Sequence, residues 1–126
     1  LKRAKEMLDE GLLKTATDYY HAAIIFQHGG TSSDYKIAQN LAIKASKLNP
    51  DNKNAKWLAC AAEDRYLLSI GKAQIWGTQF RMLKGETEWS LEPFDRTART
   101  DAQRIQNSVR TLEQTKKRLD LMNSKK

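Results

Sequence analysis

The segment 34–70 carries apolar residues at helical spacing on both sides of a short turn that contains proline. Before the turn, the apolar stripe consists of Ile37, Leu41, Ala45 and Leu48, with Ala38 and Ala42 beside it. After the turn, two adjoining apolar lines are formed by Trp57, Leu58, Ala61, Ala62, Tyr66 and Leu67. Pro50 cannot continue a helix, and so short a turn places two helices antiparallel, with alanines allowing close approach. The segment therefore predicts a helical hairpin.

Four helices are predicted before residue 72, and most of them have a recognisable start or end signal. The predicted ranges are 2–13, 18–28, 34–48 and 54–70. Thr17 is the expected cap of the second helix, and Ser32 or Ser33 is the expected cap of the third. Gly29-Gly30 is expected to end the second helix, and Gly71 to end the fourth.

The rest of the chain predicts a small β-hairpin and then a charged helical segment. Apolar and polar residues alternate in FRML and EWSL around Gly85, which favours two short strands near residues 79–91. For residues 95–126, one long helix and two helices broken at Asn107-Ser108 both fit the pattern. Thr111 and Gln114 have the spacing of a capping box, which favours the break and a last helix at 112–122.

The predicted fold is mainly α, with four to five helices in antiparallel hairpins and a small β-hairpin near residues 79–91. With 126 residues, the chain is expected to form a single helical domain. Its core is expected at about 15–95, followed by a polar, basic and helical C-terminal segment at 96–126.

The hairpin at 38–67 resembles tetratricopeptide or Sel1-type repeats, which carry spaced alanines, a proline turn and a following aromatic residue. Ala38, Ala45 and Pro50 fall in the register of such repeats, whereas Trp57 does not. No second copy with the same period is visible in the sequence. The resemblance is therefore interpreted as a style of helix packing and not as a repeat array.

The charge and hydropathy of the chain restrict its partners. The formal net charge of +7 favours nucleic acid, anionic membrane or acidic partners in general. No apolar run approaches the roughly 20 residues that cross a bilayer, so no membrane span is expected. The basic end, at 116–118 and 125–126, has no interleaved aromatic residues on which bases could stack. Nucleic acid is therefore disfavoured as a partner, and the oligomeric state stays open.

Cys60 is the single cysteine, so neither an internal disulfide nor a CxxC metal site can form. Its neighbours are alanine and leucine, which favours a small core residue over a nucleophile. The chain begins at Leu1 without methionine, so a leader or a preceding segment removed before Leu1 is an open alternative. A cytoplasmic location is expected.

Polar residues gather at three places where the helical pattern calls for apolar ones. Gln27-His28 ends the second helix, Asp64-Arg65 lies inside the fourth, and Gln74 and Gln79 follow it. Asp64 and Arg65 flank the apolar stripe, so they are either a solvated ion pair or partly buried charges that need partners. The glutamines suit either a structural network that attaches the loop to the helices or a ligand pocket.

His28 has two interpretations. At the end of a helix before two glycines, it suits a C-terminal cap whose charged form the helix dipole favours. Its ordinary pKa near neutrality also suits proton transfer. His21 lies seven residues away, roughly 10 Å along the helix axis, which is too far for the two to share a metal.

Together these clusters resemble a family of bacterial proteins catalogued as a domain of unknown function. The family is marked by a Q-H motif, an A-x-x-D-R helix and a G-x-x-Q-x-[YW]-G-T-Q loop. The matching residues are Gln27, His28, Ala61, Asp64, Arg65, Gly71, Gln74, Trp76, Gly77, Thr78 and Gln79. DRTAR and VRTLEQ resemble its closing segment, so the likeness spans about residues 17–115. Trp76 stands where tyrosine is expected, which removes a hydroxyl from that position. With no activity established for the family, the resemblance implies a pocket without naming its ligand.

The expected function is that of a small helical domain with a polar pocket that binds a small anionic or carbonyl ligand. The expected ligand-binding residues are Gln27, His28, Asp64, Arg65, Gln74 and Gln79, with Arg65 holding the anionic or carbonyl group. One alternative is a tetratricopeptide-like interaction module that binds a peptide and uses the polar network only structurally. A second alternative is a weak nucleic-acid binder. Catalysis stays open, with His28 and then Asp64 as candidates for proton transfer, and no cofactor or metal is assigned.

Overall fold

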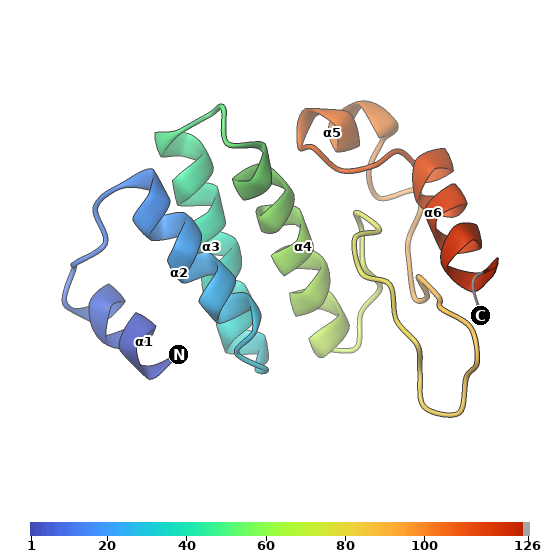
Figure 1. The fold of residues 1–126 in the computed structure, drawn as a ribbon, viewed down its shortest axis with the longest axis horizontal. Coiled ribbons are helices and arrows are strands. Elements are labelled where there is room, and N and C mark those ends of the chain that lie inside the picture. Colours follow the sequence, from blue (N-terminus) through green and yellow to red (C-terminus); the bar gives the residue numbers. More distant parts are fainter. Residues whose placement is uncertain (125–126) are drawn as a thin grey trace.

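The computed structural model describes residues 1–124 and is mainly α, as predicted (Figure 1). That part of the chain contains six helices rather than the expected four to five. Their bounds are α1 Lys2–Asp9, α2 Ala16–Gln27, α3 Ser32–Leu48, α4 Lys53–Ser69, α5 Asp101–Gln106 and α6 Leu112–Ser124. The number is higher because a short helix, α5, precedes the predicted break in the charged segment and adds to the predicted last helix.

Helix α3 packs between α2 and α4, and the three run antiparallel to their neighbours (Figure 1). Alanines occupy the contacts: Ala38 and Ala42 of α3 are fully buried in one cluster with Ala23 of α2 and Ala62 of α4. Because alanine side chains are short, the helix backbones can approach closely. Phe26, also fully buried, fills the largest space in this cluster.

Threonines and asparagine begin the central helices, at positions that differ from some predictions. Thr15 caps α2 in place of Thr17, and Thr31 caps α3 in place of Ser32 or Ser33. In both cases the threonine hydroxyl accepts a hydrogen bond from the backbone N–H of an aspartate three residues later. Asn52 caps α4 in the same way. The capping threonine is therefore the one placed three residues before an aspartate.

The expected β-hairpin is reduced to a single antiparallel bridge between Arg81 and Ser90, and residues 79–91 contain no strand. The two backbone N–H groups of this bridge donate across it at 2.8 and 2.7 Å. Neighbouring N–H groups bond to side chains instead of a second rung: Gln79 N–H donates to Gln74, and Trp89 N–H donates to Asn123. Side-chain acceptors from outside the hairpin thus compete successfully with the strand ladder.

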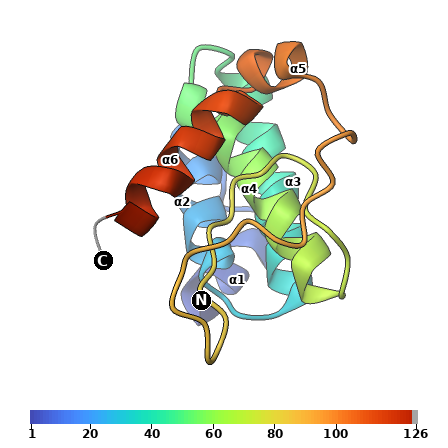
Figure 2. The same cartoon turned by 90° about the vertical axis from the view of Figure 1, so that its right-hand side faces the viewer.

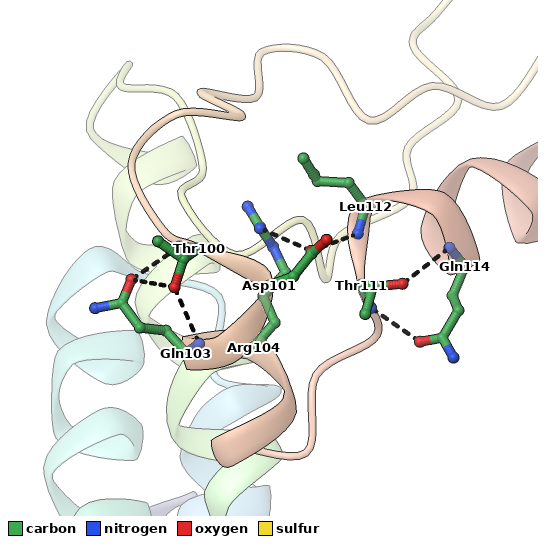
Figure 3. A network of polar contacts seen from close by, with 7 residues as sticks. All are labelled: Thr100, Asp101, Gln103, Arg104, Thr111, Leu112 and Gln114. Carbon is green, nitrogen blue, oxygen red and sulfur yellow. Dashed lines mark hydrogen bonds and ion pairs between the residues drawn. The ribbon is translucent and has the colours of Figure 1, made fainter.

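The break in the C-terminal segment is confirmed. Helix α5 ends with Asn107 as its cap, and Ser108 has a positive φ of 62° that no helix residue adopts. Thr111 and Gln114 exchange the two hydrogen bonds of a capping box at the start of α6 (Figure 3). Within residues 1–124, helix formation after residue 95 begins only at Asp101. The predicted basic end at Lys125 and Lys126 lies outside the described residues.

Residues 70–100 connect α4 to α5 and lie beside α4, while α6 lies on the far side of this connection (Figures 1 and 2). Asn123 of α6 holds the connection through two hydrogen bonds to the backbone of Trp89, at 2.7 and 3.1 Å. Among the helices of residues 1–124, none is long and apolar enough to span a bilayer.

Candidate functional site

Asp64 is fully buried in α4, and its carboxylate binds the segment that follows the helix. One oxygen accepts from the backbone N–H groups of Ile75 and Trp76, at 2.8 and 2.9 Å. The other accepts from the backbone N–H and the hydroxyl of Thr78, at 3.0 and 2.7 Å. The side chain therefore receives four hydrogen bonds, which is close to the full capacity of a carboxylate. Its role is to fold the loop 74–79 onto α4.

The buried position of Asp64 also affects titration. Burial raises the pKa of Asp64, while the hydrogen bonds from Thr78, Trp76 and Ile75 oppose this rise. Cys60, one helical turn earlier, is buried as predicted, and burial together with the nearby charges of Asp64 and Glu63 raises the pKa of its thiol to about 12. The reactive thiolate is therefore scarce at neutral pH.

Gln74 is the second residue that fixes this loop, and it too is fully buried. Its amide nitrogen donates to the carbonyl oxygens of Leu91 and Gln79, at 2.6 and 3.0 Å, and its amide oxygen accepts from Gln79 N–H at 3.0 Å. Gly77 lies at the tip of the loop with φ of 82°, and an added Cβ would lie 2.6 Å from the Phe94 ring. A side chain at this position would therefore displace the loop.

Arg65 does not pair with Asp64, although the two are adjacent in the chain. Its guanidinium donates through Nη1 to the backbone oxygen of Gln27 at 2.9 Å and through Nε to Gln79 Oε1 at 3.3 Å. Successive residues of a helix point about 100° apart, so Asp64 points into the loop and Arg65 toward the end of α2. Arg65 Nη2 has no hydrogen-bond partner among residues 1–124.

A cavity of about 670 Å³ lies between α2, α4 and the segment 78–89, with Met122 of α6 at one side. Four of the six predicted site residues line it: Gln27, His28, Arg65 and Gln79. The other two, Asp64 and Gln74, do not line it. Of the six residues, four therefore line the cavity, while Asp64 and Gln74 hold the loop 74–79 that forms one of its walls.

Gln27 and His28 occupy the α2 side of this cavity. Gln27 is 6% exposed, and its Oε1 has no hydrogen-bond partner within the described part of the chain. An unpaired buried amide oxygen is costly, but this atom is inaccessible and presents no acceptor to the cavity. His28 is exposed at the C-terminal cap of α2, where its ring is accessible to a molecule in the cavity.

Aromatic side chains supply most of the apolar wall, which the sequence did not indicate. The cavity is lined by Tyr20, Trp57, Phe80 and Trp89. Trp57 is 39% exposed, although the sequence pattern places it in an apolar line of its helix. Its place off the register of tetratricopeptide repeats is the one signal in the sequence that it has another role.

A second, smaller hollow of about 270 Å³ lies on another side of Arg65. It shares Arg65, Gln79 and Phe80 with the large cavity and is otherwise lined by Tyr35, Leu68, Ser69 and Arg81. No pattern in the sequence singles out Tyr35 or Arg81, because their common position depends on the path of the loop.

No group of three or more histidine, cysteine, aspartate or glutamate side chains is arranged to hold a metal ion in residues 1–124. Comparison of the chain with protein-family models, with curated proteins and with solved structures finds no match. What the site can do therefore rests on its geometry.

Proposed function

We propose that the chain is a ligand-binding domain whose large cavity takes a small molecule with an apolar or aromatic body and an anionic or carbonyl group. The observation that carries the proposal is the position of Arg65. Its guanidinium lines a cavity of about 670 Å³ while two of its three nitrogens are held by Gln27 and Gln79. A guanidinium fixed in this way presents its remaining N–H groups at little cost in side-chain entropy.

The polar groups beside Arg65 fit the same ligand. Gln79 is anchored through its backbone N–H to the buried Gln74, and its side-chain oxygen accepts from Arg65 Nε. A carboxamide or carboxylic group carries an oxygen acceptor for Arg65. His28 supplies a further polar group at the opening. No catalytic role is assigned to these residues.

The aromatic wall accounts for the apolar body of the ligand. Ligand cavities combine apolar and aromatic surfaces with a few polar groups that fix orientation. Trp57 and Trp89 belong to separate elements, α4 and the connection held by Asn123. A planar ring lying against these side chains would bury aromatic surface of both.

A peptide is the second candidate occupant. Helices α2 and α4, which pack on either side of α3, both line the cavity, and a peptide could lie across them. This reading keeps the predicted tetratricopeptide-like interaction module. Here Trp57 and Phe80 would hold apolar side chains of the peptide, and Arg65 would bind one of its carbonyl oxygens. Asp64 and Gln74 would have the same structural role in both readings.

The resemblance to the bacterial family also belongs to this proposal. Its three motifs supply the end of α2, the Asp64-Arg65 pair and the loop 74–79, which are adjacent in space through Asp64 and Arg65. We propose that these motifs exist to build the cavity wall. The location of the protein stays a prediction, and the cytoplasm is the expected compartment.

The test uses phenylacetate and phenylacetamide, which share a ring and a carbonyl group but differ in charge. The three indole N–H signals are followed by ¹H–¹⁵N NMR during titration of the full chain. Trp57 and Trp89 line the cavity, whereas the Trp76 indole is bonded to Glu63 at 2.7 Å and serves as an internal control. We expect saturable shifts of Trp57 and Trp89 without a shift of Trp76, and tighter binding of phenylacetate because of Arg65.

Two variants make the test specific. Trp57→Ala is expected to weaken both probes about tenfold, equivalent to about 1.4 kcal/mol. The matched control is Ile105→Ala, since Ile105 is also an exposed apolar side chain but lies on α5 away from the cavity. If neither probe moves the two indole signals, the small-molecule proposal is wrong. Shifts of the same signals by a short peptide would then establish the peptide reading.

A further inference from the structure

We infer that the small hollow between Arg65 and Arg81 is a binding site for a phosphate group. The hollow has a volume of about 270 Å³ and is formed by residues of three elements: Tyr35 of α3, Arg65 of α4 and Arg81 of the connection 70–100. The hollow shares Arg65, Gln79 and Phe80 with the large cavity and differs from it by Tyr35 and Arg81, so a phosphate here and an anionic group in the cavity would compete for Arg65.

The charge in the hollow is uncompensated. Neither Arg65 nor Arg81 forms an ion pair with a carboxylate of residues 1–124, and no aspartate or glutamate lines the hollow. Two half-buried guanidinium groups facing one small space repel each other unless an anion lies between them. The missing negative charge is the first argument for an anionic ligand.

The hydrogen-bonding groups agree with the charge, because those still unoccupied are donors. Arg65 has Nη2 available, the Arg81 guanidinium makes no hydrogen bond with the described residues, and the same holds for the Tyr35 hydroxyl. Ser69 is already occupied, since its hydroxyl donates to the Tyr66 carbonyl at 2.6 Å. A ligand in this space must therefore accept hydrogen bonds from several directions.

The backbone around these donors is fixed. Arg81 is one of the two bridge residues, so its N–H and its carbonyl are both bonded to Ser90. The Arg65 guanidinium lies 5.7 Å from the centre of the Tyr35 ring, and Arg81 lines the same hollow. The Arg65 guanidinium is held by two hydrogen bonds and loses little entropy when a ligand binds, whereas the Arg81 side chain becomes ordered only on binding.

Phosphate fits these donors better than a carboxylate. A carboxylate is planar and carries one charge, so one guanidinium can satisfy it through two parallel hydrogen bonds. Phosphate carries up to two charges, and its oxygens are arranged in three dimensions. Two arginines and a hydroxyl from three separate elements match the second geometry and not the first.

The test is a titration of the full chain with inorganic phosphate at constant ionic strength, followed through the Nε–Hε signals of arginine by NMR. We expect saturable shifts of Arg65 and Arg81, together with little response to acetate at the same ionic strength. Arg81→Gln is expected to weaken phosphate binding at least about tenfold, and Tyr35→Phe to weaken it by a smaller factor.

The matched control is Arg118→Gln, which removes one charge from an exposed position on α6. It is expected to leave phosphate binding nearly unchanged. Equal weakening by Arg81→Gln and Arg118→Gln would mean that phosphate senses only the net charge, and the site would be refuted. Equally tight binding of acetate would refute a preference for phosphate. A lack of saturable shifts would refute the existence of any anion site in the hollow.

The two proposals fail separately. Trp57 lines the large cavity but not the hollow, and Arg81 lines the hollow but not the cavity. Trp57→Ala is therefore expected to leave phosphate binding intact, and Arg81→Gln to leave the phenylacetamide shifts intact.

Discussion

At the scale of single residues, Asp64 determines where the loop 74–79 lies. Three backbone N–H groups and one hydroxyl converge on its two oxygens inside the protein. Buried N–H groups without a partner are rare because each costs the desolvation of a donor. Aspartate can satisfy all four donors, because it carries two acceptor oxygens on a short side chain.

Asp64→Asn is expected to destabilise the protein by about 2–4 kcal/mol, because the amide nitrogen cannot accept the two hydrogen bonds that one carboxylate oxygen receives. The matched control is Glu63→Gln on the same helix, since a glutamine oxygen can still accept the Trp76 indole bond. Urea unfolding at neutral pH measures both variants. A loss no greater for Asp64→Asn than for Glu63→Gln would show that the loop is held by other contacts.

Several properties of these residues were readable from the sequence. The pattern of α4 left two interpretations open for Asp64 and Arg65, a solvated ion pair or partly buried charges that need partners, and the burial of Asp64 agrees with the second. The partners themselves were not readable, because Gln27 contributes its backbone oxygen to Arg65 and any residue type has such an oxygen. The same holds for Ile75 and Trp76, whose N–H groups bind Asp64.

At the scale of elements, the junction between α5 and α6 depends on one ion pair (Figure 3). Asp101 Oδ1 accepts from Arg104 Nη1 at 3.2 Å and from the backbone N–H of Leu112, at the start of α6, at 2.9 Å. Arg104 is 1% exposed, and its Nε and Nη2 have no partner in the described part of the chain. Its guanidinium lies 5.9 Å from the centre of the Phe94 ring.

Replacing Asp101 alone is therefore expected to lower the free energy of unfolding, whereas replacing both Asp101 and Arg104 is not. Asp101→Ala leaves a buried arginine without its carboxylate, and because that carboxylate is half exposed the expected cost is about 1–3 kcal/mol. Arg104→Met replaces a poorly satisfied buried charge by an apolar side chain of similar length and is expected to be neutral or stabilising. Urea unfolding of both single variants and of the double variant checks this.

The double variant decides between two explanations. If the cost of Asp101→Ala comes from the uncompensated arginine, Arg104→Met in the same chain restores most of the stability. If the cost comes from the lost bond to Leu112, the double variant stays as unstable as Asp101→Ala. The second result would contradict the expectation.

Element boundaries were predictable where the signal is local. The capping box at Thr111 and Gln114 and the break before it involve residues within seven positions of each other. The hairpin prediction was wrong because Trp89 N–H bonds to Asn123, 34 residues away. The same distant contact places α6 beside the large cavity, so Met122 could not be recognised as a lining residue from the sequence.

At the scale of the whole molecule, the net charge of +7 is distributed over most elements. The run Lys116 to Arg118 lies on an exposed face of α6, and Lys117 there pairs with Glu113 at 3.5 Å. A field of this kind attracts polyanions without selecting among them. The alternative of a weak nucleic-acid binder rests on this positive field alone. It has no support from aromatic residues beside Lys116 to Arg118 on which bases could stack.

Binding to single-stranded oligothymidine is accordingly expected to be weak at low salt and to disappear as salt rises to physiological levels. Each phosphate contact releases about 0.7 counterion from a single strand, so the logarithm of the affinity falls linearly with the logarithm of the salt concentration. Fluorescence anisotropy with a labelled oligonucleotide over a salt series measures this slope. Arg118→Gln is expected to flatten it, whereas Trp57→Ala has no effect. Affinity that persists at physiological salt and is lost in Trp57→Ala would instead mean that bases stack in the large cavity, and nucleic acid would replace the small molecule as its ligand.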